Sequence, residues 1–157
     1  MATKQYIIDG VRFLAREVRR ATSHFSDDHW NRKTVDGWTV KEVCCHLLST
    51  AQGMTVFLPM IQGLPEGADL ATMFDIDDVN AQGVAANIEK SPAELVEGIA
   101  QAYEGLVPVI EGLDQGLLDK RIKFSVYDMD MPVSELAASA IVLHGLAHTY
   151  HCASARA

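Results

Sequence analysis

Apolar residues recur every three or four positions along four stretches of the chain, the spacing that predicts amphipathic helices. These stretches are residues 3–25, 40–58, 92–113 and 132–155. A long connection separates the second stretch from the third. Four helices of this length, without alternating strands between them, predict an all-α four-helix bundle.

Two of the predicted helices begin at recognisable capping sequences. Thr39 and Glu42 have the spacing of a capping box, in which the hydroxyl accepts from one free amide and the carboxylate from another. Ser91, Pro92 and Glu94 repeat the signal, with proline at the first helical position. These signals place the starts of the second and third long helices.

The connecting segments are less regular. Residues 63–76 contain Gly and Pro and predict a loop, and residues 77–90 predict a short helix with Asp77 or Asp78 near its start. Residues 119–131 alternate enough to be extended. Since no repeat and no low-complexity tract interrupts the chain, we expect residues 1–157 to form a single domain.

Charge and cysteine content narrow the classes of function. Lysine and arginine number 13 against 21 aspartates and glutamates, which gives a net charge of −8. Such a chain is a poor candidate for binding nucleic acid or an anionic membrane, so we expect a small-molecule partner. Three cysteines without a C-x-x-C pair argue against a disulfide framework. The amino terminus lacks the features of a signal peptide, and the apolar run 136–147 is too short to span a membrane, so the expected location is the cytoplasm.

Three of the six histidines fall in one stretch of eight residues inside the last predicted helix. At 100° per residue, His148 lies about 40° from His144, and His151 about 20° from it on the other side. All three therefore share a helix face, which we expect to be the face that carries Leu136, Ala140 and Ile141. Histidines four residues apart on one face are a recurring arrangement in helical metal sites.

His46 is the candidate for a third metal ligand. It lies near the inward stripe of the second helix, so it meets His144 and His148 if the second and fourth helices are neighbours. Three imidazoles with one open position would be a catalytic type of site, with zinc favoured and nickel or iron as alternatives. The competing interpretation is that these are core histidines, or partly exposed ones favoured by the helix dipole.

Several of these residues together resemble a known family. The segment Gly37-Trp38-Thr39-Val40, followed by His46-Leu47, is similar to the opening of the DinB superfamily, and more narrowly to the metal-binding domain of mycothiol-dependent maleylpyruvate isomerases. Asp77 and Asn80 match a D-x-x-N element of that narrower group. His144 and His148 match the ligand positions of the family's second metal motif. The resemblance thus implies a metal site made of His46, His144 and His148.

The resemblance also implies a function, with one departure. The isomerase group commonly has Glu where this chain has His144 and Asp where it has His151, so the three-histidine set is closer to the broad DinB pattern. We expect a thiol-dependent S-transferase or isomerase that uses a low-molecular-weight thiol. The alternatives are a hydrolase that uses metal-bound water, and a non-catalytic metal-binding stress-response bundle. The resemblance further suggests a homodimer.

Three further roles stay open at this stage. His151 is either a catalytic base or orienting group beside the metal, or a solvated residue near the terminus. Asp77 and Asn80 either cap the short helix or line the mouth of a pocket. Aromatic side chains that could line a pocket, but fit the core equally well, are Trp38, Tyr103 and Tyr150.

Overall fold

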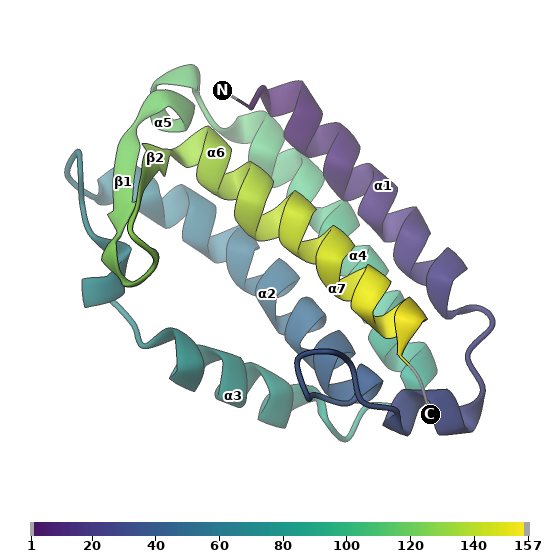
Figure 1. Ribbon diagram of the computed structural model, residues 1–157. Helices are drawn as coiled ribbons and strands as arrows, with labels where there is room; N and C mark the ends of the chain where they lie inside the picture. The colour runs from purple at the N-terminus through teal and green to yellow at the C-terminus, as the bar shows by residue number, and fades with distance from the viewer. Residues whose placement is uncertain (1, 156–157) are drawn as a thin grey trace.

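The computed structural model describes residues 2–155 and is dominated by helices (Figure 1). The long helices are α1 (Lys4–Thr22), α2 (Val40–Met60), α4 (Pro92–Gly112) and a last helix built from α6 (Val133–Ala137) and α7 (His144–Ser154). A π-helical segment, Ala138–Leu143, joins α6 to α7. The shorter elements are α3 (Ile76–Asn87), α5 (Gln115–Asp119) and the antiparallel strands β1 (Arg121–Phe124) and β2 (Met129–Pro132). The predicted all-α four-helix bundle is confirmed.

Both predicted capping boxes are present. The Thr39 side chain accepts from the amide of Glu42, whose carboxylate accepts from the amide and the hydroxyl of Thr39. Ser91 and Glu94 make the same contacts at the start of α4. The short helix has Asp77 and Asp78 in its first turn, near its start as predicted. Its cap, however, is Asp75, whose side chain accepts from the amides of Asp77 and Asp78, so of the two roles left open for Asp77 the capping role is wrong.

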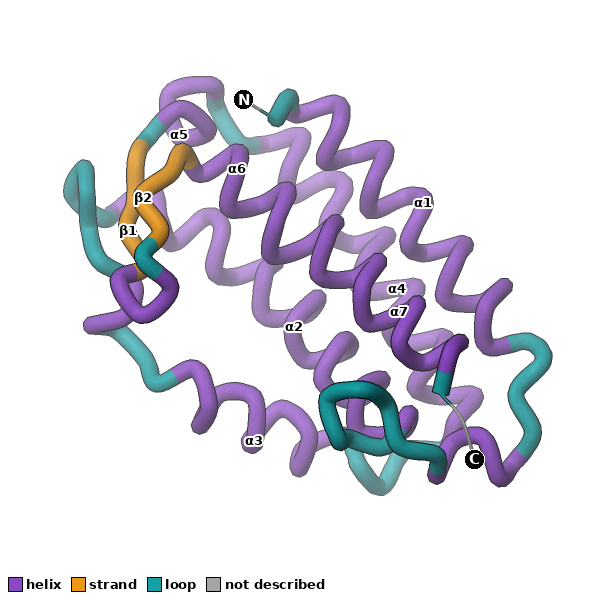
Figure 2. The backbone as a smooth tube through the Cα atoms, viewed as in Figure 1, coloured by secondary structure: helices purple, strands orange, loops and turns teal. Residues whose placement is uncertain are grey.

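The four long helices pack as a bundle around a continuous apolar core. Helix α1 packs on α4 and on the last helix, while α2 packs on α4, α3 and α7 (Figure 2). Gly10 of α1 allows a close approach, since a Cβ there would lie 2.6 Å from Val142 Cγ2. The largest fully buried side chains include Ile7, Leu14, Leu47, Leu58, Ile99, Leu106 and Ile110.

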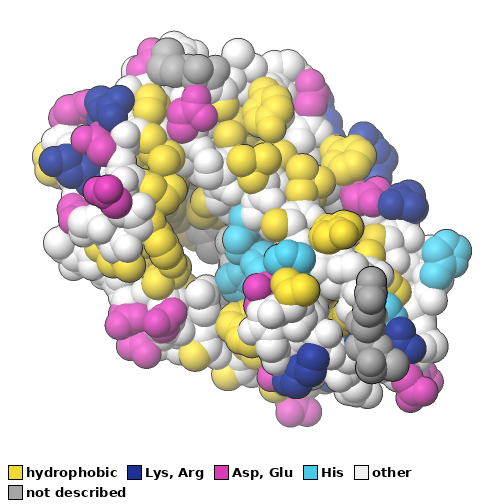
Figure 3. Space-filling model, viewed as in Figure 1, with side chains coloured by type: hydrophobic (Ala, Val, Ile, Leu, Met, Phe, Trp, Pro, Cys, Tyr) yellow, Lys and Arg dark blue, Asp and Glu magenta, His cyan; other side chains and the backbone are white. Residues whose placement is uncertain are grey.

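The hairpin and the loop before α3 form one end of the molecule. Residues 67 and 68 bond to β1, because the amide of Gly67 donates to Arg121 and the amide of Lys123 donates to Ala68. Helix α3 then runs along α2 and stands away from the last helix (Figure 1). This arrangement leaves a hollow between α3, the hairpin and the last helix, which the space-filling view shows (Figure 3).

The helical segment Val40–Gly63 is long and apolar enough to cross a membrane by length and composition. The sequence analysis considered only residues 136–147 as a possible membrane span and did not identify this longer segment. Core helices meet the same test, and this one lies in the bundle with the buried side chains of Val43, Leu47, Leu48 and Leu58 in the common core.

Candidate metal centre

His46, His144 and His148 lie together although 98 residues separate the first two. The Nε2 atoms of His46 and His144 are 2.9 Å apart, and one ligand atom from each of the three rings lies within 4.8 Å of the others. The rings of His144 and His148 are 4.5 Å apart between centroids, and those of His46 and His148 are 5.2 Å apart. Histidine side chains gather at the edge of the hollow in Figure 3.

Local packing fixes the positions of the two helices that carry these rings. The capping box at Thr39 starts α2 two turns before His46, and Trp38 packs edge-on against the His46 ring at 5.4 Å. Gly145 of α7 is in close contact with Tyr103 of α4. His46 is 7% exposed, so its side chain is buried within the bundle.

The three imidazoles are held in their neutral form. Burial, with a smaller contribution from His148, lowers the pKa of His46 to about 4. Burial likewise lowers the pKa of His144 to about 3, with contributions from both neighbouring histidines. Burial also lowers the pKa of His148, and Asp36 opposes that shift. At neutral pH these rings therefore present the unprotonated nitrogens that a metal ion requires.

The donor set fits a divalent transition metal. Two Nε2 atoms that face each other at 2.9 Å either share a proton, with one ring donating, or share a cation. Nitrogens that bind one tetrahedral zinc ion at about 2.0–2.1 Å lie about 3.4 Å apart, which a small opening of the cluster provides. Three imidazoles and no carboxylate or thiolate among them favour zinc, with nickel and iron as alternatives.

A second cluster adjoins the first and shares His148. Asp36 Oδ2 accepts a hydrogen bond from His151 Nδ1 at 2.9 Å and lies 4.0 Å from His148 Nδ1. That His148 nitrogen is buried and has no hydrogen-bond partner within residues 2–155. One ring nitrogen of His148 also lies within 4.8 Å of ligand atoms of His46 and His144. Outer carboxylates of this kind orient ligating histidines and fix their tautomer.

Asp36 was not among the predicted site residues. The sequence signal that could have found it is its place in the loop before Gly37, two residues from Trp38, which contacts His46. Gly37 has a φ of 82°, a left-handed conformation that glycine adopts without strain. The loop thereby reverses immediately before α2 and places Asp36 beside α7.

The histidine face of the last helix differs from the predicted face. The buried residues of α7 are Gly145, Thr149 and Cys152, each one position after a histidine, while the histidines are only partly buried. The π-helical segment just before them contains Ala140 and Ile141, so the register of the helix changes between α6 and α7. As a result, the histidines lie beside the buried face, at the hollow, instead of on it.

The other residues considered from the sequence lie as follows. Tyr103 is buried in the core, and Tyr150 is 70% exposed with its ring 6.4 Å from that of His151. Trp38 contacts the ring of His46. His29 is partly buried and its Nε2 lies 2.8 Å from the carbonyl of Cys152. The three cysteines are free and buried, and none belongs to the clusters.

The described residues form a helical bundle with a candidate three-histidine cluster at its open side, which agrees with the resemblance to the DinB superfamily. In agreement, the chain matches mycothiol-dependent maleylpyruvate isomerase with a TM-score of 0.72 at 12% identity, over 99% of this chain and 62% of that one. The structure of a histidine-to-alanine mutant of the same enzyme matches with a TM-score of 0.73. YfiT from Bacillus subtilis, described as "a probable metal-dependent hydrolase with an unusual four-helix bundle topology", gives 0.65 at 13% identity, over 96% of this chain and 82% of that one.

The family follows from the sequence match. Residues 11–140 match the profile of the mycothiol maleylpyruvate isomerase N-terminal domain, and the chain belongs to this family. The matched range contains His46 and ends four residues before His144. A further similarity, 32% over 88 residues, is to dihydroxy-acid dehydratase of Flavobacterium psychrophilum, of which this chain spans 15%.

Proposed function

We propose that the protein is a metal-dependent enzyme that uses a low-molecular-weight thiol, as an S-transferase or an isomerase. The observation that carries this proposal is the convergence of three neutral imidazoles from α2 and α7 beside an open hollow. Membership of the isomerase domain family supports the thiol chemistry.

Within this proposal each residue has a defined task. His46, His144 and His148 hold the metal ion, and the hollow admits the substrate. A bound divalent ion would lower the pKa of a coordinated thiol or water and so supply a nucleophile at neutral pH. His151 Nδ1 donates a hydrogen bond to Asp36, and its other ring nitrogen, Nε2, is the atom proposed to accept a proton during the reaction.

A second candidate function is a metal-dependent hydrolase. The three-histidine donor set supports it, since the glutamate common in the isomerase group is absent from position 144. The similarity of the fold to YfiT, over 82% of that chain, supports it as well. A third candidate is a bundle in which the metal only stabilises the fold.

Metal analysis tests the site first. Protein purified without a histidine tag should carry close to one divalent ion per chain, and His148→Ala should lose it. His24→Ala removes an exposed histidine that belongs to neither cluster and should keep the ion. Equal metal content in wild type and His148→Ala would show that the ligand assignment is wrong.

Activity assays then separate the three functions. Mycothiol, bacillithiol and glutathione are each offered with a set of electrophiles, and formation of a thioether or an isomerised product supports the leading proposal. Hydrolysis of esters or amides without any thiol supports the hydrolase. Metal-dependent stability without turnover supports the structural bundle.

We further propose a cytoplasmic homodimer. Helix α1 and the π-helical segment before α7 carry exposed apolar side chains, among them Phe13 at 44% and Leu143 at 52% exposure. Light scattering on the purified protein should give twice the chain mass of 17.2 kDa, and Leu143→Glu should shift it to the monomer.

A further inference from the structure

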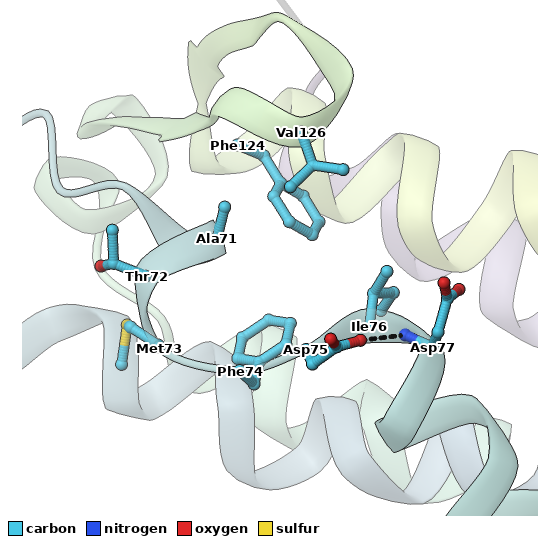
Figure 4. A pocket seen from close by; sticks show the side chains of 9 residues that line it. All are labelled: Ala71, Thr72, Met73, Phe74, Asp75, Ile76, Asp77, Phe124 and Val126. Carbon is cyan, nitrogen blue, oxygen red and sulfur yellow. Dashed lines mark hydrogen bonds between the residues drawn. The ribbon is translucent and has the colours of Figure 1, made fainter.

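A cavity of about 450 Å³ lies between the hairpin and the loop that leads into α3 (Figure 4). Phe124 and Val126 form the hairpin side, and Phe74 and Ile76 form the opposite side. This volume lies within the range of about 300–1,000 Å³ that is usual for small-molecule sites. None of the residues that the sequence pointed to as metal ligands lines it.

Two phenylalanines, Phe74 and Phe124, stand on opposite walls of the cavity. The rings of Phe74 and Phe124 are 6.0 Å apart at 70°, and each contacts a further ring, Phe57 and Tyr127 respectively. Phe74 and Phe124 pack against the core, while Val126 is 64% exposed. Such walls favour an apolar group, and aromatic faces attract a cation in addition.

The charged groups of the cavity are all negative. Asp75 and Asp77 line it, and no lysine, arginine or histidine is among its lining residues. The start of α3 also points here, and its dipole alone would favour an anion. However, the Asp75 carboxylate already accepts from the amides of Asp77 and Asp78, so these donors are occupied by the protein's own anion.

The cavity borders the same hollow as the histidines. Figure 3 shows the histidines on one side of the hollow and a band of hydrophobic side chains over the hairpin on the other. Helix α3 connects the two sides, with its first turn at the cavity and Gly83 closely packed against Ser49, one turn of α2 beyond His46.

From this geometry we infer that the cavity binds the apolar, neutral or positively charged part of the substrate and disfavours anionic substrates. The inference rests on the proposed function, because it specifies the class of electrophile that the metal centre would receive. Asp75 and Asp77 repel a carboxylate, and Phe74 and Phe124 supply the apolar contact. A dicarboxylate would meet the same two negative charges.

Three probes of equal shape test the charge preference. Phenylpropylamine, phenylpropanol and phenylpropanoate carry the same ring with a positive, neutral and negative end. Each is titrated into isotope-labelled protein at low ionic strength, and NMR shifts of residues 71–77 and 124–126 report binding. We expect the amine and the alcohol to bind, and the amine to bind at least roughly tenfold more tightly than the carboxylate.

Variants assign the preference to the cavity. The double variant Asp75→Asn with Asp77→Asn keeps a side chain that caps α3 and should remove most of the tenfold difference. Asp78→Asn is the matched control, since it removes the same charge from the same helical turn outside the lining residues. Phe124→Ala and the exposed Val126→Ser should weaken the binding of all three probes, and Phe124→Ala should weaken the amine most, because the aromatic face that attracts a cation is lost.

The outcomes also separate this inference from the proposed function. Equal or tighter binding of the carboxylate, absence of binding, or shifts elsewhere on the protein would each overturn the inference. His46→Ala should leave probe binding unchanged, because it removes a metal ligand and no cavity wall. If the protein binds no metal but keeps the charge preference, the inference about the cavity stands and the proposed function is wrong. If it binds metal but shows no charge preference, the metal centre stands and the inference about the cavity is wrong.

Discussion

The two sides of α7 differ in how closely they pack against the rest of the bundle. On one side, Gly145 allows close contact with α1 and α4, where an added Cβ would lie 2.5 Å from Tyr103 Oη and 2.8 Å from Leu14 Cδ1. On the other side, His144 and His148 are partly buried, and histidine side chains gather at the edge of the hollow (Figure 3). The first side is therefore closed by tight packing, and the second carries the candidate metal ligands.

The difference shows how one helix can serve both stability and function. Side chains of the close-packed side contribute to the free energy of unfolding because they have no room to move. The histidines contribute little to the core, and their neutral rings lose hydrogen bonds to water on burial, a cost that a bound metal would offset. The following predictions test whether the two sides are energetically separate.

The largest expected effect is that of a metal on stability. At a free zinc concentration of about 100 times Kd, binding adds about 2.7 kcal/mol to the free energy of unfolding. For a chain of this size the Tm should therefore rise by about 5–10 °C, and a chelator should reverse the rise. Differential scanning calorimetry measures it.

His144→Ala is the comparison for that experiment. It should abolish the increase in Tm with zinc while changing the Tm of the metal-free protein little. An undiminished increase in this variant would mean that zinc binds elsewhere.

The next effect concerns Asp36, which links the loop before α2 to the histidine side of α7. Asp36→Asn removes the negative charge near His148 and His151, and we expect zinc affinity to fall by about 10–100-fold. Competition with a chromophoric chelator measures the affinity. Asp27→Asn is the control, because it removes an exposed aspartate at the start of the short helical turn Asp27–Asn31, and it should leave the zinc affinity unchanged. Equal zinc affinities in the two variants would exclude an orienting role for Asp36.

A smaller effect is expected on the closed side. Gly145→Ala introduces a Cβ against Tyr103 and Leu14, and overpacking should outweigh the higher helix propensity of alanine, for a net loss of about 1–2 kcal/mol. Gly105→Ala is the matched control in α4, where nothing lies within 4 Å of the added Cβ, and should gain about 0.5–1 kcal/mol. Urea denaturation measures the change in the free energy of unfolding for each variant. If both variants were stabilised, or both destabilised, the close contact at Gly145 would be contradicted.

The smallest effect tests the start of α2, and it depends on pH. Hydrogen bonds from the amide and then the hydroxyl of Thr39 hold the pKa of Glu42 below its usual value. The ionised carboxylate therefore stabilises the fold at neutral pH, and this contribution is lost as the pH falls through the lowered pKa. Glu42→Ala should cost about 0.5–1 kcal/mol at pH 7 and progressively less in acid, as measured by denaturation at several pH values.

The sequence by itself determined the helices and their starts, because capping and amphipathic periodicity are local properties. The Thr39–Glu42 and Ser91–Glu94 boxes lie where they were predicted. The grouping of His144, His148 and His151 on one side of a helix was equally readable, since it follows from 3.6 residues per turn. The family resemblance pointed to His46 as their partner.

Only the tertiary structure decided which way these histidines point and what surrounds them. The π-helical segment Ala138–Leu143 changes the register of the last helix, and no periodicity that assumes a regular helix contains that change. Asp36 meets His151, and the hairpin meets the loop before α3, through contacts between residues far apart in the chain. Such contacts depend on how whole helices pack, which is a property of the complete chain and not of any one segment of it.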